Sequence, residues 1–284
     1  MRELLKNFNE LVLFKHSIFS LPFIFVAMVV SADGWFGYRL LFLGLISAIT
    51  ARNFAMAFNR YLDRDHDSQN ERTKNRPSVD GRLSGSSIAT FTALNGIAFI
   101  VTAYFVNELA FYLSFPILLI LASYSYFKRF SSLAHTILGL SLGLAPIAGV
   151  VAVEEYIPLW SIYISIGVMF WVAGFDLLYS LQDMEFDKKF GLHSIPSKYG
   201  EKITFQISAT FHILTILFWT LFVIEAELML LGQLAVLVSA MMLLYEHYLI
   251  RKDFKKIDRA FFTVNGYLGV IFFIFVTADR IVYG

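Results

Sequence analysis

Long apolar segments constrain the fold of this chain more than any other feature. Nine segments are close to the length of about 20 helical residues that crosses the hydrocarbon core of a bilayer. They span residues 17–33, 39–62, 86–106, 109–127, 133–153, 158–182, 203–224, 227–249 and 260–280. Their apolar residues follow no strict period, which is typical of helices buried in lipid or in a bundle core. The sequence therefore predicts an all-α, polytopic membrane protein with nine transmembrane helices.

Positive charges alternate between the loops in a way that predicts orientation. The cations of one side are Arg2, Lys6 and Lys15 before the first segment, Arg64, Arg72, Lys74, Arg76 and Arg82 after the second, Lys128 and Arg129 after the fourth, Lys188, Lys189, Lys198 and Lys202 after the sixth, and Arg251, Lys252, Lys255, Lys256 and Arg259 after the eighth. Only Arg39 and Arg280 fall on the other side. Because loops rich in Lys and Arg stay cytoplasmic, we predict a cytoplasmic N-terminus and an external C-terminus.

The two longest loops follow acidic clusters at Asp63 and Asp183, which are 120 residues apart (183 − 63). Four spans separate these clusters. We therefore predict a single domain over 1–284, made of two four-helix units at about 1–130 and 131–250 and a ninth helix. Internal symmetry of this kind often places a binding site where the two units meet.

The first acidic cluster carries ligands suited to a divalent cation. Asn59, Asp63 and Asp67 are four residues apart, so one helical face presents all three, and Arg52 lies seven residues before Asn59 on that face. Mg²⁺ prefers oxygen ligands of this type and binds substrate phosphates at the same time. Arg52 and Asn59 lie inside an apolar segment, where polar groups are costly unless they face a cavity or a partner.

The second acidic cluster repeats the pattern with Asp176, Asp183 and Asp187 on one face, bordered by Tyr179. Converging carboxylates repel one another unless cations intervene, and two Mg²⁺ ions bridging a diphosphate would supply those cations. The predicted catalytic metal ligands are Asn59, Asp63, Asp67, Asp183 and Asp187. The predicted diphosphate-binding cations are Arg64, Arg72, Lys74, Lys128, Arg129 and Lys198. For any single one of these cations, the positive-inside distribution is an alternative explanation.

At these residues the chain resembles the UbiA superfamily of intramembrane prenyltransferases. The family motif NDxxDxxxD reads NRYLDRDHD here, so Arg60 replaces an aspartate that we interpret as peripheral. The second motif, DxxYxxxDxxxD, is matched in full between Asp176 and Asp187. The resemblance implies nine helices around a central cavity, with the motifs on the cytoplasmic side. It also implies a bacterial inner-membrane enzyme of the 4-hydroxybenzoate type, a group that includes enzymes acting on 1,4-dihydroxy-6-naphthoate.

The expected function is therefore Mg²⁺-dependent transfer of a polyprenyl group from a polyprenyl diphosphate to one of these two acceptors in respiratory quinone biosynthesis. Both acceptors carry a carboxylate, which needs a fixed cation in an apolar cavity. We expect Arg52, together with Asp176 and Tyr179, to bind the acceptor. The lipid bilayer is the expected surrounding, and no nucleic-acid partner is expected.

Three alternatives stay open on the sequence. Another member of the superfamily would prenylate haem or homogentisate instead. An ion-coupled transporter would use intramembrane acids and cations as an ion path, but here the acids cluster at one membrane face, and the segments that carry them contain no proline beyond Pro158, the first residue of the sixth segment. A CDP-alcohol phosphotransferase would show a DGxxAR motif, which this chain lacks.

Overall fold

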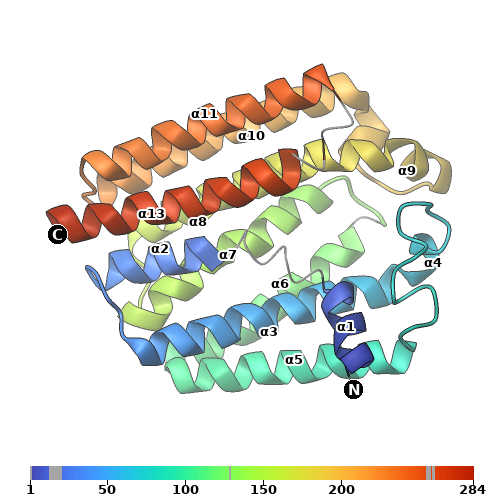
Figure 1. The fold of residues 1–284 in the computed structure, drawn as a ribbon, viewed down its shortest axis with the longest axis horizontal. Helices are drawn as coiled ribbons and strands as arrows, with labels where there is room; N and C mark the ends of the chain where they lie inside the picture. Colours follow the sequence, from blue (N-terminus) through green and yellow to red (C-terminus); the bar gives the residue numbers. More distant parts are fainter. Residues whose placement is uncertain (1, 13–20, 128, 254–256, 258–259) are drawn as a thin grey trace.

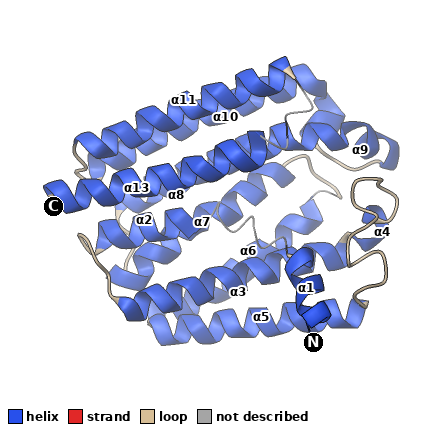
Figure 2. Cartoon of the chain, in the orientation of Figure 1, coloured by secondary structure: helices blue, strands red, loops and turns tan. Residues whose placement is uncertain are grey.

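The computed structural model describes residues 2–12, 21–127, 129–253, 257 and 260–284. Within these residues the chain consists of helices and connecting loops, with no strand (Figure 2). The predicted all-α fold is confirmed.

Among the residues that the structure describes, six helices lie between positions 2 and 127. Their bounds are α1 Arg2–Leu11, α2 Leu21–Ser31, α3 Tyr38–Leu62, α4 Arg64–Asp67, α5 Gly85–Val106 and α6 Glu108–Phe127. The second half continues with α7 Ala134–Glu154, α8 Leu159–Ser180, the 3-10 turn Leu181–Asp183, α9 Met184–Phe190, α10 Ile195–Glu225 and α11 Leu230–Lys252. A π-helical turn, Ala260–Val264, leads into α13, Asn265–Tyr283.

Eight helices among the described residues are long and apolar enough to cross a membrane, and they correspond to the second to ninth predicted segments. The first predicted segment, 17–33, differs. Its residues 17–20 lie outside the described residues, and α2 covers eleven residues, which is about 16 Å of helix. Eight of these eleven residues are buried by protein, so α2 is an interior helix of the bundle. The count of nine spans is thus confirmed for eight of them.

Local sequence signals set the helix ends next to the loops. The Ser84 side chain accepts a hydrogen bond from the backbone N–H of Ser87 and caps α5. Ser194 and Ser197 cap α10 reciprocally, with a proline in the first turn, which explains why α10 begins eight residues before the predicted segment. Helix α10 then bends at Gly200, whose φ of 79° is left-handed.

Close packing of α7 against α8 and α2 holds the centre of the bundle together. A Cβ added to Gly143 of α7 would lie 2.8 Å from the carbonyl oxygen of Ser165 in α8. Small residues allow this approach, as in other membrane helix pairs. The largest apolar core joins α2, α8, α10, α11 and α13 around the buried rings of Phe23, Trp171, Trp219 and Phe272.

The two ends of the bundle differ in character. Helices α4 and α9, which carry the last aspartate of each acidic cluster, lie at the same end, and the C-terminus lies at the other (Figure 1). We call the first the motif end. The short helix α1 is tied to the loop before α5, because Arg82 donates to both carboxylate oxygens of Glu10 at 2.6 and 2.9 Å. This hydrogen bonding lowers the pKa of Glu10, so the contact stays ionised at neutral pH.

Candidate active site

The first acidic cluster forms where α3 gives way to α4. The backbone leaves regular helical geometry at Asp63, but Asp67 N–H still donates to the Asp63 carbonyl at 2.8 Å, so the side chains stay on one side. The Asn59 amide donates to Asp63 Oδ2 at 2.9 Å and to Ser125 Oγ of α6 at 3.4 Å. Asp67 is buried, while Asp65 between them is exposed. The predicted shared face is thus present, although two helices build it.

The second acidic cluster forms where α8 gives way to α9. A 3-10 turn that ends at Asp183 separates these helices, and Asp187 follows one turn later with only 2% of its surface exposed. Asp63, Asp67, Asp183 and Asp187 all line one cavity of about 200 Å³, which we call the polar cavity. The structure therefore brings together the four carboxylates that the sequence paired.

A second and larger cavity of about 400 Å³ adjoins the polar cavity and runs into the bundle. We call it the apolar cavity, because aliphatic and aromatic side chains of α2, α3, α5, α6, α7 and α8 and of the π-helical turn line most of it. This is the central cavity that the fold was expected to have. The residues that line both cavities define the junction between them: Asn59, Arg60, Arg72, Arg76, Tyr124, Leu138, Asp176 and Tyr179.

Arg72 links the two acidic clusters. It comes from the loop after α4, and its Nε and Nη2 donate to the two carboxylate oxygens of Asp183 at 3.1 and 2.5 Å. Asn70 donates to the same carboxylate at 3.1 Å. Burial acts to lower the pKa of Arg72, but the hydrogen bond and charge of Asp183 outweigh it, so that its pKa is raised. Arg72 is therefore a permanent cation at the junction of the two cavities.

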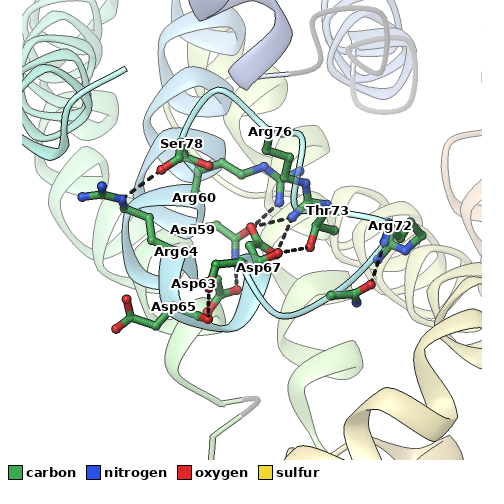
Figure 3. A network of polar contacts seen from close by, with 12 residues as sticks. Asn59, Arg60, Asp63, Arg64, Asp65, Asp67, Arg72, Thr73, Arg76 and Ser78 are labelled. Atoms are coloured by element: carbon green, nitrogen blue, oxygen red, sulfur yellow. Dashed lines mark hydrogen bonds and ion pairs between the residues drawn. The ribbon is translucent and has the colours of Figure 1, made fainter. Parts of the chain in front are cut away.

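Arg76 binds a carboxylate of the first acidic cluster, as Arg72 binds one of the second. Its Nη1 donates to both oxygens of Asp67 at 2.7 Å (Figure 3). The Thr73 hydroxyl donates to the backbone carbonyl of Asp67 at 2.9 Å, which fastens the same loop to α4. Each arginine can exchange its carboxylate for a phosphate without leaving the cavity, since the guanidinium fork suits both anions.

The other predicted diphosphate ligands are placed differently. Arg64 donates through Nε to the Ser78 carbonyl at 2.9 Å, Lys74 pairs with Glu71, and Lys198 lies over the Tyr199 ring, and none of the three lines either cavity. Arg129 donates to the Leu62 carbonyl and stands 3.7 Å from Asp63 Oδ1, outside the cavity wall. Lys128 lies outside the described residues.

The three predicted acceptor ligands all line the apolar cavity. Arg52 lies on α3, about two helical turns from the junction, and donates to the Val12 carbonyl at 3.4 Å. Asp176 lies at the junction and is 2.7 Å from Nδ1 of His135, a buried residue of α7. Tyr179 packs against Phe261 of the π-helical turn, with ring centres 4.2 Å apart. The structure thus gives Asp176 a histidine as its partner, and not Arg52.

Arg60 departs most from the sequence interpretation. It stands where the motif has an aspartate, and we interpreted that position as peripheral. The structure instead buries Arg60 to 7% exposure and places it in the wall of both cavities. Its Nη1 donates to Asn59 Oδ1 at 3.2 Å (Figure 3). The interpretation as a peripheral position is wrong for this chain.

The donor set suits Mg²⁺ better than a structural metal. Among the described residues, no three acidic or histidine side chains gather closely enough to hold an ion by themselves. Mg²⁺ requires only one or two carboxylates when phosphate oxygens and waters complete its octahedron. Four carboxylates around one polar cavity therefore fit an ion that binds together with a diphosphate.

Sequence reasoning missed Arg60, Arg76 and His135 as site residues. Arg76 and His135 gave no distinguishing signal, because one sits among other loop cations and the other opens an apolar helix. For Arg60 the signal was present, since a cation close to the end of an apolar segment is costly unless it faces a cavity.

Comparisons with known proteins identify relatives along nearly the whole chain. The sequence model of the UbiA prenyltransferase family matches residues 20–276. The 4-hydroxybenzoate octaprenyltransferase of Methylobacillus flagellatus is 29% identical over 252 residues, which cover 88% of this chain and 84% of that protein. The protein of the same name from Colwellia psychrerythraea is 26% identical over 258 residues, 89% of this chain and 88% of that protein.

Solved structures share the fold. A UbiA homolog from Aeropyrum pernix K1, in its apo form, superposes with a TM-score of 0.84 at 28% identity, covering 93% of this chain and 98% of that chain. A UbiA homolog from Archaeoglobus fulgidus, bound to GPP and Mg²⁺, superposes with a TM-score of 0.79 at 21% identity, covering 97% of this chain and all of that chain.

Proposed function

Because this chain belongs to the UbiA prenyltransferase family and is a prenyltransferase, we propose that it transfers a polyprenyl group from a polyprenyl diphosphate to an aromatic acceptor that carries a carboxylate. 4-Hydroxybenzoate and 1,4-dihydroxy-6-naphthoate are the proposed acceptors, and respiratory quinone biosynthesis is the proposed setting. Curated relatives that bear the name 4-hydroxybenzoate octaprenyltransferase support the first acceptor.

One observation carries the proposal: a carboxylate-lined polar cavity opens directly into an apolar cavity of about 400 Å³. A prenyl diphosphate has the same two parts, a charged head and an apolar tail. The head would bind at the motif end, where Asp63, Asp67, Asp183 and Asp187 would hold it through Mg²⁺ and Arg72 and Arg76 would contact phosphate oxygens. The homolog from Archaeoglobus fulgidus bound to GPP and Mg²⁺ supports this use of the fold.

For Asn59 we propose a role other than that of the metal ligand predicted from the sequence. In the structure its amide nitrogen donates to Asp63 and its amide oxygen accepts from Arg60. We therefore assign the metal to the four carboxylates and give Asn59 the role of holding Asp63 in place.

The chemistry follows from the position of the junction. Bound Mg²⁺ would supply positive charge that stabilises the departing diphosphate. The bond between C1 and the diphosphate oxygen breaks, and its electron pair leaves with the diphosphate toward Arg72 and Arg76. The allylic cation at C1 then lies at the mouth of the apolar cavity, where aromatic and aliphatic walls exclude water. A ring carbon of the acceptor forms the new bond to C1, and the ring proton passes to Asp176, which His135 holds at the junction.

Arg52 is the proposed anchor of the acceptor carboxylate. It lines the apolar cavity on the same helix as Asn59 but about two turns further from the motif end, so the two anionic groups of the substrates would stay apart. An acceptor held at both Arg52 and the junction would present its ring to C1.

Replacing Arg52 with alanine should raise the KM for 4-hydroxybenzoate by about tenfold to a hundredfold, because a charge-assisted hydrogen bond contributes about 1.5–3 kcal/mol. The KM for the prenyl diphosphate should change by less than about twofold. Arg52→Lys should restore binding in part, since lysine keeps the charge but lacks the bidentate fork. Steady-state kinetics with each substrate varied in turn measure both constants. Equal changes in the two KM values would assign Arg52 to the diphosphate or to the structure.

The proposed reaction is tested directly by product analysis. Detergent-purified protein is incubated with Mg²⁺, a polyprenyl diphosphate and one acceptor at a time from a panel of hydroxybenzoates, naphthoates and homogentisate, and products are identified by mass. We expect a product whose mass equals the acceptor plus the prenyl group minus one hydrogen, for 4-hydroxybenzoate or 1,4-dihydroxy-6-naphthoate. A product from homogentisate alone would refute the proposed acceptor class.

We further propose that the protein lies in the bacterial inner membrane with its motif end in the cytoplasm. The cationic loop between α4 and α5 and the one around α9 lie at this end (Figure 1), and loops of this kind stay cytoplasmic. The C-terminus, which lies at the opposite end, would then be external.

A further inference from the structure

Arg60 is a buried cation that faces both cavities. It lies in the last turn of α3, and only 7% of its surface is exposed. In Figure 3 its side chain reaches toward the same region as that of Arg76, beside Asn59 and Asp67. Its hydrogen bond goes to a neutral acceptor, Asn59 Oδ1, at 3.2 Å.

The described residues give Arg60 no carboxylate within ion-pair distance. Asp67 and Asp63 lie close enough to act on Arg60 electrostatically, but Asp67 accepts both of its contacts from Arg76, and Asp63 accepts a hydrogen bond from Asn59. A buried charge that no carboxylate contacts directly is only partly compensated, and the second guanidinium of Arg76 close by adds repulsion. Such a site is stabilised by an anion that enters the cavity between the two arginines.

The position of Arg60 selects the diphosphate as that anion. Arg60 lines the polar cavity together with all four carboxylates, whereas Arg52, two turns earlier on the same helix, lines only the apolar cavity. A diphosphate carries several negative charges and offers oxygens that match the guanidinium fork. The acceptor carboxylate carries a single charge and has Arg52 as its own cation.

The hydrogen bond to Asn59 has a consequence for the metal. The space beside Asn59 Oδ1, where the sequence predicts a Mg²⁺ ion, is occupied by a fixed positive charge. We propose that Arg60 binds the diphosphate directly and takes the place of one of the two Mg²⁺ ions predicted from the sequence, so that this chain binds its prenyl donor with one metal ion fewer. The proposal rests on the proposed function, because it assumes a diphosphate in the polar cavity.

The assignment completes the charge balance of the first step. When the bond between C1 and oxygen breaks, the electron pair stays on the diphosphate oxygen. Arg60 neutralises part of that charge from the junction side, where the bond breaks. Its guanidinium keeps its proton throughout, so no proton transfer accompanies this step.

The dependence of donor binding on Mg²⁺ concentration tests this proposal without turnover. The probe is geranyl thiolodiphosphate, an analogue that reacts slowly, and its Kd is measured by calorimetry at a series of free Mg²⁺ concentrations. For the wild-type protein, the logarithm of the association constant should rise with the logarithm of the Mg²⁺ concentration with a slope of about one, by mass action. Arg60→Asp, which puts a carboxylate in place of the cation, should raise the slope to about two.

Arg60→Gln separates charge from packing, and it keeps the test usable if Arg60→Asp fails to fold. The slope should stay at about one, and the Kd should rise by about tenfold to a hundredfold at every Mg²⁺ concentration, as expected for a lost charge-assisted hydrogen bond. Arg39→Gln is the matched control. Arg39 begins the same helix at the opposite end, where it donates to the Phe105 carbonyl, and its replacement should leave both Kd and slope unchanged.

A slope of about two for the wild-type protein, or an unchanged Kd in Arg60→Gln, would overturn the inference and leave the proposed function intact. A higher KM of Arg60→Gln for the acceptor alone would also overturn it, because Arg60 would then bind the acceptor carboxylate. No Mg²⁺-dependent binding by the wild-type protein would overturn the proposed function, and this inference with it.

Discussion

Replacing Asp67 or Asp183 with asparagine should lower prenyl transfer by about a thousandfold, because charge stabilisation by a bound metal contributes several kcal/mol to the transition state. Asparagine keeps the shape of the side chain but removes the negative charge that holds Mg²⁺. The substitution also removes the ion pair of Asp67 with Arg76 or of Asp183 with Arg72. The guanidinium group of that arginine would then no longer be held in position at the junction. Asp63→Asn and Asp187→Asn should show the same direction of change.

Product formation over time measures the effect, and an unchanged elution profile in detergent shows that each variant is folded. Asp65→Asn is the matched control, because Asp65 lies between Asp63 and Asp67 but is exposed and lines neither cavity. It should keep activity within about twofold of wild type, as surface substitutions usually do. EDTA should abolish activity, and added Mg²⁺ should restore it. Wild-type turnover in all four aspartate variants would refute the proposed site.

Replacing Gly139 with leucine should destabilise the protein by about 3 kcal/mol, the upper range for overpacking a well-packed interior. A Cβ at this position of α7 would overlap the backbone carbonyl oxygen of Met169 in α8 and would lie 3.1 Å from the Cβ of Ala173. Backbone atoms cannot turn away as a flexible side chain can, so α7 would have to separate from α8. Both helices line the two cavities, and activity should fall together with stability.

Thermal unfolding in detergent, followed by circular dichroism, measures this change. The midpoint should fall by about 6–12 °C, given about 2–4 °C for each kcal/mol in a chain of this size. Ala93→Leu is the control, because it makes a similar change of volume at an exposed position of α5. It should leave the midpoint within about 2 °C of wild type. An unchanged midpoint for Gly139→Leu would show that the two helices are not packed as closely as the structure has them.

The sequence predicted most of the fold because the hydrocarbon core of a membrane imposes one rule. Every backbone polar group there needs an internal partner, so an apolar segment of sufficient length becomes a helix. That rule located eight spans within a few residues of their helices, with α10 extending eight residues further because of its Ser194 cap. The rule did not predict that α2 is a short helix buried by its neighbours, because burial among helices depends on tertiary packing.

The carboxylate site was predictable for a related reason. Asn59, Asp63 and Asp67 follow the helical repeat, as do Asp183 and Asp187, and a repeat of four residues places side chains together whatever the rest of the chain does. The division into two four-helix units and the assignment of individual metal ligands stay predictions.

Only the tertiary structure decided which cations reach the cavities. Arg64, Arg72, Lys74 and Arg76 lie within thirteen residues, at the start of α4 and in the loop after it, and they look alike in the sequence. Arg72 and Arg76 point inward to Asp183 and Asp67, while Arg64 binds a backbone carbonyl and Lys74 pairs with Glu71. A loop has no fixed repeat, so the direction of each side chain follows from long-range contacts.

Arg60 and His135 show the same limit within helices. The helical repeat gives the face of a residue, but it does not say which face of that helix meets a cavity. The packing of α3 against α6 and α7, and of α7 against α8, turns Arg60 and His135 toward the junction. The sequence alone therefore determined the membrane fold and the pairing of two acidic clusters, because both follow from local periodicity. The tertiary structure decided which charges surround them, because contacts between distant segments set the direction of each side chain.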